Sequence, residues 1–180
     1  MTYTYVRQGY WVGVVTSDIL GDEGAKLCHQ LADAAKAFDW AKVFEILERY
    51  PQWVNSPRPD GPSLYSPLHQ AAYGGAPREV VDRLVEAGAF RTLRTAKDER
   101  PVDIARRKGQ RHLLDVLEPH LVVEVAERDL TALRTWFHAL IRVRTRGIEE
   151  DYDVHRLRLP GVEEAQEVSY PVWFAFPGMY

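Results

Sequence analysis

Two groups of residues carry side chains that could do chemistry. Cys28 and His29 are adjacent, and a second group gathers four carboxylates and one imidazole: Glu149, Glu150, Asp151, Asp153 and His155. A thiol beside an imidazole suggests a nucleophile and its base, but neighbours on a helix point about 100° apart. The acidic group offers oxygen ligands for a hard cation, but it lacks the loop glycine and the regular spacing of a calcium loop. We therefore predict no catalytic and no metal-binding residue.

The sequence lacks the motifs that have a direct mechanistic meaning. There is no glycine-rich phosphate loop after a strand, no H-E-x-x-H, no G-x-S-x-G and no paired C-x-x-C. We therefore predict no cofactor. A catalyst that works through shape alone needs no such motif, because it only has to hold an apolar substrate in a reactive conformation. A cofactor-independent enzyme of the cyclase or isomerase type remains the alternative to a non-catalytic protein.

Composition and charge exclude several classes of partner. The chain has 180 residues, and its 46% hydrophobic and 27% charged content is typical of one soluble globular domain. A net charge of −3 provides no basic field for phosphates, so we predict no nucleic-acid partner. The sequence has no apolar run of the length that a membrane span or a signal peptide needs, and its one cysteine cannot form an internal disulfide. We expect a cytoplasmic protein without membrane contact.

The most specific pattern is S-P-L-H-Q-A-A at residues 66–72. Gly75 follows where a turn between two helices needs a flexible residue, residues 80–85 supply an apolar stripe, and Gly88 stands where a second helix should stop. This stretch resembles an ankyrin repeat, whose helix pair opens with T-P-L-H-x-A. Ser66 takes the place of the threonine.

The pattern recurs at the ankyrin period. Residues 98–105 read D-E-R-P-V-D-I-A, and Pro101 follows Pro67 by 34 residues (101 − 67). Asp103 replaces the histidine of the motif. Upstream, residues 31–47 match the two helices more weakly and have no P-L-H, as a terminal repeat would.

The resemblance implies a mainly α fold, in which residues 25–119 form an ankyrin-repeat solenoid of about three helix pairs. It also implies a structural role for His69, whose imidazole should tie neighbouring turns together by hydrogen bonds. The first two repeats are further apart than the standard period, and the extra residues at 56–63 contain prolines and a glycine. These residues forbid regular structure and predict an irregular loop that could contact a partner.

Two extensions flank the repeats and complete the predicted compact unit. Residues 1–24 are expected to be β-like, because Tyr3–Val15 is rich in aromatic and β-branched side chains. Residues 120–180 are expected to hold a helix that starts near Asp129 and caps the solenoid. Alternating patterns then predict short strands near residues 154–159 and 168–176.

Ankyrin proteins bind other proteins through loop tips and the exposed side of the first helices, which together form a concave surface. The resemblance places the following residues there: Tyr65, Tyr73, Arg94, Lys97, Glu99, Arg107 and Lys108. Tyrosine and arginine suit recognition because they offer large contact area and directional hydrogen bonds. The alternative for residues 106–108 is a solvated helix end whose cations complement the dipole. We predict a non-catalytic protein-binding module, such as a regulator or an antitoxin or immunity-type protein.

Aromatic residues crowd the segment 172–180. We favour the interpretation that they pack on the C-terminal helix as core. The alternative is an apolar pocket between the repeats and the tail, lined by Trp136, Trp173 and Phe176. Such a pocket would hold a small apolar ligand or the substrate of a cofactor-free enzyme.

Overall fold

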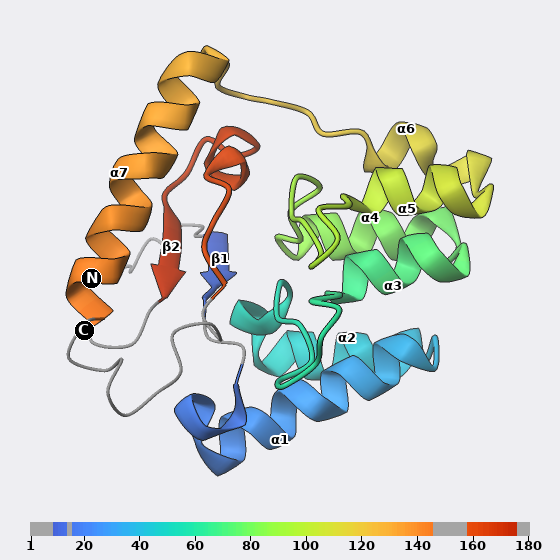
Figure 1. Ribbon diagram of the computed structural model, residues 1–180. Coiled ribbons are helices and arrows are strands. Elements are labelled where there is room, and N and C mark those ends of the chain that lie inside the picture. Colours follow the sequence, from blue (N-terminus) through green and yellow to red (C-terminus); the bar gives the residue numbers. More distant parts are fainter. Residues whose placement is uncertain (1–8, 14–15, 146–157, 176–180) are drawn as a thin grey trace, which may run out of the picture.

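The computed structural model describes residues 9–13, 16–145 and 158–175, and this part of the chain is mainly helical (Figure 1), as expected. The helices are α1 (Ser17–Lys36), α2 (Trp40–Arg49), α3 (Pro67–Gly74), α4 (Arg78–Glu86), α5 (Pro101–Lys108), α6 (Leu114–Leu117) and α7 (Glu127–Thr145). Short 3-10 turns occupy Pro51–Trp53, Arg111–Leu113 and Glu163–Gln166. No helix in the described ranges is long and apolar enough to cross a membrane.

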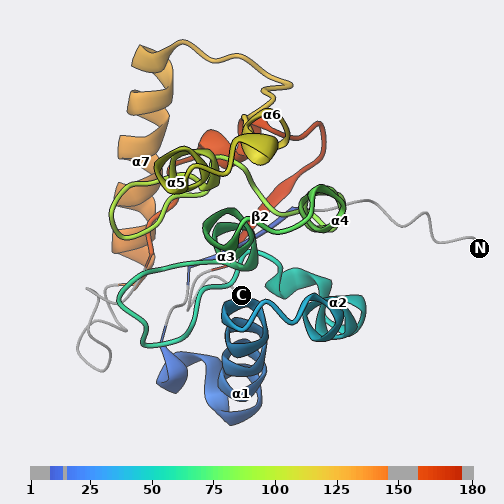
Figure 2. The same cartoon turned by 90° about the vertical axis from the view of Figure 1, so that its right-hand side faces the viewer.

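Helices α1 to α6 stand in two columns. Figure 2 shows α1, α3 and α5 in one column and α2, α4 and α6 in the other, so that each consecutive pair contributes one helix to each column. Helix α3 packs on both α1 and α5, and it packs on its own partner α4. The loop expected at residues 56–63 is irregular, without helix or strand.

The second and third pairs begin in the same way. Helix α3 starts at Pro67 and α5 at Pro101, a position that suits proline because its missing N–H would be unsatisfied there anyway. In both, the third residue of the helix accepts a hydrogen bond from the backbone N–H before the proline. His69 does so in α3 at 3.2 Å, and Asp103 does so in α5 at 3.0 Å. Local sequence therefore fixes where both helices start.

His69 also connects α3 to the loop that precedes α5. Its Nδ1 accepts from the backbone N–H of Ser66, so the neutral ring carries its proton on Nε2, which lies 3.0 Å from the carbonyl oxygen of Leu93. Complete burial and, to a smaller extent, the charge of Arg158 lower the pKa of His69 to about 3. The ring is thus neutral and donates to the loop, which is the structural role expected of it.

The core of the helix pairs is apolar throughout. It combines alanines on the first helices with larger aliphatic residues on both helices of each pair, including Ala35, Val43, Leu47, Leu68, Ala71, Ala72, Val81, Leu84, Ile104, Ala105, Leu113 and Leu117. Alanine lets the first helices approach closely, because it has no bulk to separate them. These residues recur along the chain at the helical spacing of the apolar stripes that the sequence predicts.

A short sheet joins segments from both ends of the described chain. Strand β1 (Gly9–Val12) pairs in parallel with β2 (Val172–Ala175), with Trp11 opposite Phe174. A second apolar cluster surrounds this sheet, formed by Trp11, Phe90, Leu93 and Ile141 with Phe137, Leu159 and Phe174 against it. Strands are thus present within two of the three expected segments. Residues 158–159 of the expected strand 154–159 are not in a strand, and residues 17–24 of the expected β-like extension belong to α1. Residues 3–8, 14–15, 154–157 and 176 of the expected strands lie outside the described residues.

Helix α7 does not cap the last helix pair. It starts two residues before Asp129, but the segment 118–126 leads it away from α6, and it lies on the far side of the sheet (Figure 1). Ile141 is fully buried there, and the rings of Phe137 and Phe174 meet edge to face at 5.1 Å. Phe137 and Ile141 of α7 find their partners in the cluster around the sheet, so the capping role expected for this helix is not the one observed.

Gly88 provides a test of this local geometry. It has a φ of 100° after the end of α4, and a Cβ at this position would meet its nearest neighbour, a Val54 methyl, at 3.9 Å. Backbone strain and not steric clash should therefore decide the effect of a substitution. We expect Gly88→Val to lower the free energy of unfolding by about 2 kcal/mol, and Gly88→Asn by about half as much. Urea unfolding followed by tryptophan fluorescence measures both, and equal midpoints for the two variants would contradict the strain argument.

Candidate functional site

Five of the seven residues predicted to contact a partner lie together, and we call them the aromatic-basic patch: Tyr65, Tyr73, Glu99, Arg107 and Lys108. The rings of Tyr65 and Tyr73 meet edge to face with centroids 6.4 Å apart, and the ammonium of Lys108 lies 4.2 Å from the Tyr73 centroid. Arg107 donates to both carboxylate oxygens of Glu99, at 2.6 and 3.0 Å. A hydrogen bond with Glu99 and, to a smaller extent, one with Tyr65 raise the pKa of Arg107.

A small hollow adjoins the aromatic-basic patch at Tyr65. Its volume is about 200 Å³, and it lies between α1, the irregular loop 56–63 and the start of α3. Its walls include Ala32, Ala35, Arg58, Pro62, Tyr65 and Gln70. The exposed Tyr73 and the half-buried Tyr65 beside this hollow offer a partner both an aromatic surface and a place to insert a side chain.

The other two predicted contact residues lie elsewhere. Lys97 is exposed on the loop 91–100. Arg94 instead turns towards the C-terminal segment, where its guanidinium lies 3.2 Å from Asp98 and 3.9 Å from Glu163. Arg94 is therefore part of a different site.

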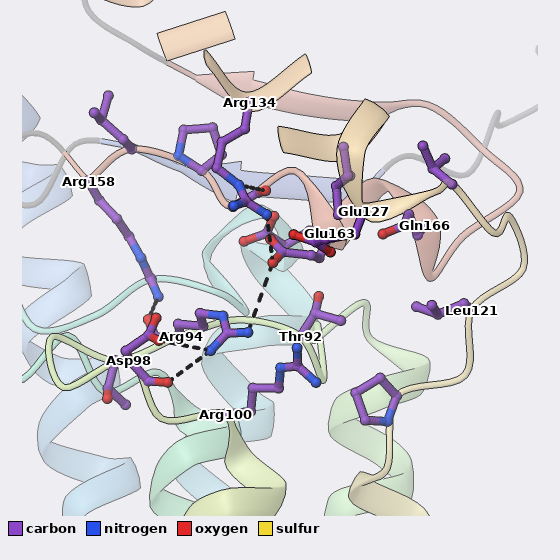
Figure 3. Close-up of a pocket in the computed structure, with 18 of the residues that line it drawn as sticks. Thr92, Arg94, Asp98, Arg100, Leu121, Glu127, Arg134, Arg158, Glu163 and Gln166 are labelled. Atoms are coloured by element: carbon purple, nitrogen blue, oxygen red, sulfur yellow. Dashed lines mark hydrogen bonds and ion pairs between the residues drawn. The ribbon is translucent and has the colours of Figure 1, made fainter. Parts of the chain in front are cut away.

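That site is a cavity of about 900 Å³, which we call the arginine cavity (Figure 3). Four segments and Leu64 enclose it, the segments being the loop 91–100, the connection 118–125, helix α7 and residues 158–166. Its walls include four arginines, Arg94, Arg100, Arg134 and Arg158, and five carboxylates, Asp98, Glu118, Glu127, Glu163 and Glu164. The helix pairs thus supply one side of the cavity and the C-terminal segments supply the other.

Glu163 holds the two sides of the arginine cavity together. One of its oxygens lies 3.1 Å from Arg134 on α7 and 3.9 Å from Arg94 on the loop 91–100. Arg134 also donates from Nε to the carbonyl oxygen of Gly161 at 2.8 Å. These pairs are partly shielded from solvent, so they fix the shape of the cavity more firmly than exposed ion pairs would.

Two ionisable side chains of the cavity wall are almost completely buried. Glu164 accepts a hydrogen bond of 3.1 Å from the indole of Trp11, and burial raises its pKa to about 7. Arg158 donates to the carbonyl oxygen of Arg94, and its guanidinium lies 5.8 Å from the Trp11 ring. Burial lowers the pKa of Arg158 to about 10, so it remains charged at neutral pH.

Three buried polar atoms of this wall have no hydrogen-bond partner among the described residues: Nη1 of Arg158, Nε of Arg100 and Oε2 of Glu164. Folded proteins rarely leave such atoms unpaired, because the lost hydration is not replaced. The two nitrogens belong to cations and call for an acceptor. The arrangement therefore suits a bound group that carries oxygen atoms.

Trp136 and Trp173 do not line the arginine cavity or the hollow beside Tyr65. Their side chains are 77% and 54% exposed, on α7 and β2 respectively. Phe176, the third residue of the expected aromatic pocket, lies outside the described residues. A cavity does lie between the helix pairs and the C-terminal segments, but nine of its lining residues are charged and neither tryptophan is among them.

Sequence reasoning missed most of the arginine cavity because its residues are far apart in the chain. Arg94 and Arg158 meet across 64 positions, and no motif connects them. One signal was available: Arg134 and His138 stand one helical turn apart, off the apolar stripe of α7. Nε2 of His138 donates to the carbonyl oxygen of Pro160 at 2.7 Å, beside the Gly161 contact of Arg134.

The other chemical candidates do not form a site in the described chain. Cys28 is buried, where desolvation raises its pKa, and Ser56 donates to its sulfur at 3.3 Å. No group of three metal-binding side chains occurs among the described residues, and the acidic segment from Glu149 to His155 lies outside them. No protein-family model and no curated protein matches the sequence.

Glu164 should make stability depend on pH. An unfolded chain releases this proton near pH 4.5 and the folded chain near pH 7, so between these values only the folded state holds the proton and stability falls as pH rises. Trp11, Arg158 and Glu163 are the groups that face it. We expect Glu164→Gln to be more stable than the wild type at pH 8, with a gain that disappears towards pH 5 at roughly 1 kcal/mol per pH unit.

Chemical unfolding at several pH values measures this gain. Glu124→Gln is the matched control, because Glu124 is exposed. A stability difference between Glu164→Gln and the wild type that stays constant from pH 5 to pH 8 would contradict the assignment.

Proposed function

We propose that residues 25–119 are three ankyrin-type repeats and that the protein is a non-catalytic module that binds a protein partner. The motif register supports the repeats, and so do the two-column arrangement of α1 to α6 and the matching starts of α3 and α5. Gly75 and Gly109 both end a first helix with a left-handed φ, of 66° and 74°. A regulator and an antitoxin or immunity-type protein both act by such binding.

The observation that carries the binding role is the aromatic-basic patch. Tyr73 and Arg107 are exposed on successive first helices, and Lys108 lies over the Tyr73 ring. Interfaces concentrate their binding energy in tyrosine and arginine, because these side chains bury large area while they make directional hydrogen bonds. The Glu99 carboxylate holds Arg107 in place before a partner arrives, which lowers the entropic cost of binding.

A cofactor-free enzyme has less support. It would need an apolar pocket to shape its substrate, and the tryptophans expected to line one are exposed instead. The arginine cavity carries many charged side chains, so it suits the binding of an ionic ligand better than the binding of an apolar substrate in a reactive conformation.

The test replaces two residues of the patch at once. We expect Tyr73→Ala with Arg107→Glu to weaken binding to the purified partner at least 100-fold, because each residue is a candidate hot spot worth about 2 kcal/mol. The partner is first captured from a lysate of the natural host and identified, and its affinity is then measured by calorimetry. The fold should survive, since both side chains are exposed.

Arg49 and Tyr50 provide a matched control. They are an exposed arginine and tyrosine with a cation–π contact of 5.8 Å at the end of α2, outside the patch. Arg49→Glu with Tyr50→Ala makes the same chemical changes and should leave the affinity unchanged. If the patch variant binds as tightly as this control, the protein-binding assignment to these residues is wrong.

A further inference from the structure

Two cations of the arginine cavity form no ion pair with a carboxylate among the described residues, and the charge of Glu164 acts on Arg158 only at longer range. Arg134 pairs with Glu163, and Arg94 pairs with Glu163 and Asp98. Arg100 and Arg158, by contrast, have no carboxylate oxygen within 4.0 Å in the described ranges. Figure 3 shows them reaching the cavity from different sides, Arg158 from the C-terminal segment and Arg100 from the helix pairs.

Leaving these groups unpaired is unfavourable. Arg158 is only 8% exposed, and both guanidinium groups keep a buried N–H without an acceptor. An unpaired buried donor on a charged group costs more than one on a neutral group. A water molecule would accept one hydrogen bond but would not neutralise the charge. An anionic oxygen does both.

The cavity also offers apolar surface. Leu64, Leu121, Val125, Leu130 and Leu159 are among its walls, and about 900 Å³ is enough for a small organic molecule. We propose that the arginine cavity binds a small organic anion, a carboxylate or a phosphate monoester with an apolar body. Its anionic group contacts Arg158, a further oxygen reaches Arg100, and its apolar part lies against the leucines. The proposal does not rest on the proposed protein binding, because the cavity uses none of the residues of the aromatic-basic patch.

Calorimetry with phenyl phosphate tests the site, and phenylacetate distinguishes carboxylate from phosphate recognition. We expect at least one of them to bind, with inorganic phosphate at least tenfold weaker because it lacks the apolar body, and phenol without detectable binding. Arg100→Gln and Arg158→Gln should each weaken binding at least tenfold. Arg111→Gln, an exposed arginine outside the cavity, should not.

Thermal stability provides a second readout, because it distinguishes an arginine that binds the anion from one that only supports the fold. Because Arg158 is a buried charge without a carboxylate partner, Arg158→Gln should unfold at a temperature equal to or above that of the ligand-free wild type. It should also lose the rise in unfolding temperature that the anion gives the wild type. No binding of either anion at millimolar concentration, or equal binding by both variants, would show a water-filled polar cavity only and overturn the proposal.

A separate observation concerns the outer face of α7. Four large apolar residues follow one another along it at spacings of three and four, and they are 46% to 77% exposed: Leu133, Trp136, Leu140 and Val143. This is the spacing of a helix that packs against another helix. A contiguous apolar stripe that contains an exposed tryptophan marks an interaction surface.

The charges at the two ends of this stripe identify its occupant. Asp129 lies in line with the stripe one turn before Leu133, and Arg144 flanks it one turn after Leu140. In an antiparallel pair of α7 helices, Leu133 of one copy lies against Leu140 of the other. Asp129 of each copy then lies next to Arg144 of the other, which gives two equivalent ion pairs related by the two-fold axis. We infer that α7 mediates an antiparallel homodimer through this stripe.

A charge exchange tests the homodimer. Sedimentation should give twice the 20.7 kDa chain mass for the wild type, and Asp129→Arg or Arg144→Asp alone should weaken dimerisation about tenfold. The two changes combined should restore it, because the pair is re-formed with its signs reversed. Within one helix the two residues are about 22 Å apart, so rescue has to be intermolecular.

Trp136→Glu should abolish the dimer, and Thr135→Glu on the neighbouring face should not. A wild type that is monomeric at 100 µM, or a double variant without rescue, would overturn the inference. The first result would show that another molecule or another part of the chain covers the stripe, and the second that the copies do not pair antiparallel.

Discussion

The attachment of the terminal sheet to the helix pairs depends on one buried amide. Asn55 is 1% exposed, and its Nδ2 donates to the carbonyl oxygens of Tyr10 at 2.8 Å and Gly88 at 2.9 Å. Its Oδ1 accepts from the backbone N–H of Phe90 at 3.0 Å. One side chain thus forms hydrogen bonds with three backbone groups from two segments, and it connects these segments where no regular secondary structure does. Replacing it would leave these groups unpaired in the interior, which costs far more than the bonds themselves contribute.

The position of the arginine cavity follows from this anchor. Asn55 fixes β1 and with it Trp11, whose indole holds Glu164 and whose ring lies near Arg158. A second anchor acts from the C-terminal side, where Glu167 accepts from the backbone N–H groups of Arg91 and Thr92. Both anchors are buried polar contacts, so they set direction as well as distance. The C-terminal segments are therefore held at one angle against the loop 91–100, which leaves the space between them as a cavity.

The sequence predicted what local chemistry determines. Pro67 with His69, and Pro101 with Asp103, mark two helix starts from residues that are neighbours in the chain, and the repeat period then placed Tyr73 and Arg107 on one surface. It did not predict the arginine cavity or the position of α7. Those depend on contacts across 64 and more residues, such as Arg158 with Arg94, for which no periodicity exists. The apolar stripe of α7 was visible, but amphipathicity alone does not say which surface a helix will cover.

The loop 91–100 belongs to both proposed sites. Glu99 holds Arg107 in the aromatic-basic patch, while Arg94 and Arg100 line the arginine cavity. Thr95 stiffens the loop between them, because its hydroxyl accepts from the backbone N–H groups of Lys97 and Glu99 and its own N–H donates to the Glu99 carbonyl. A stiff loop cannot absorb a shift at one end without moving the other. Any effect of a bound anion on the affinity for a protein partner is therefore reciprocal, and the partner changes the affinity for the anion by the same factor.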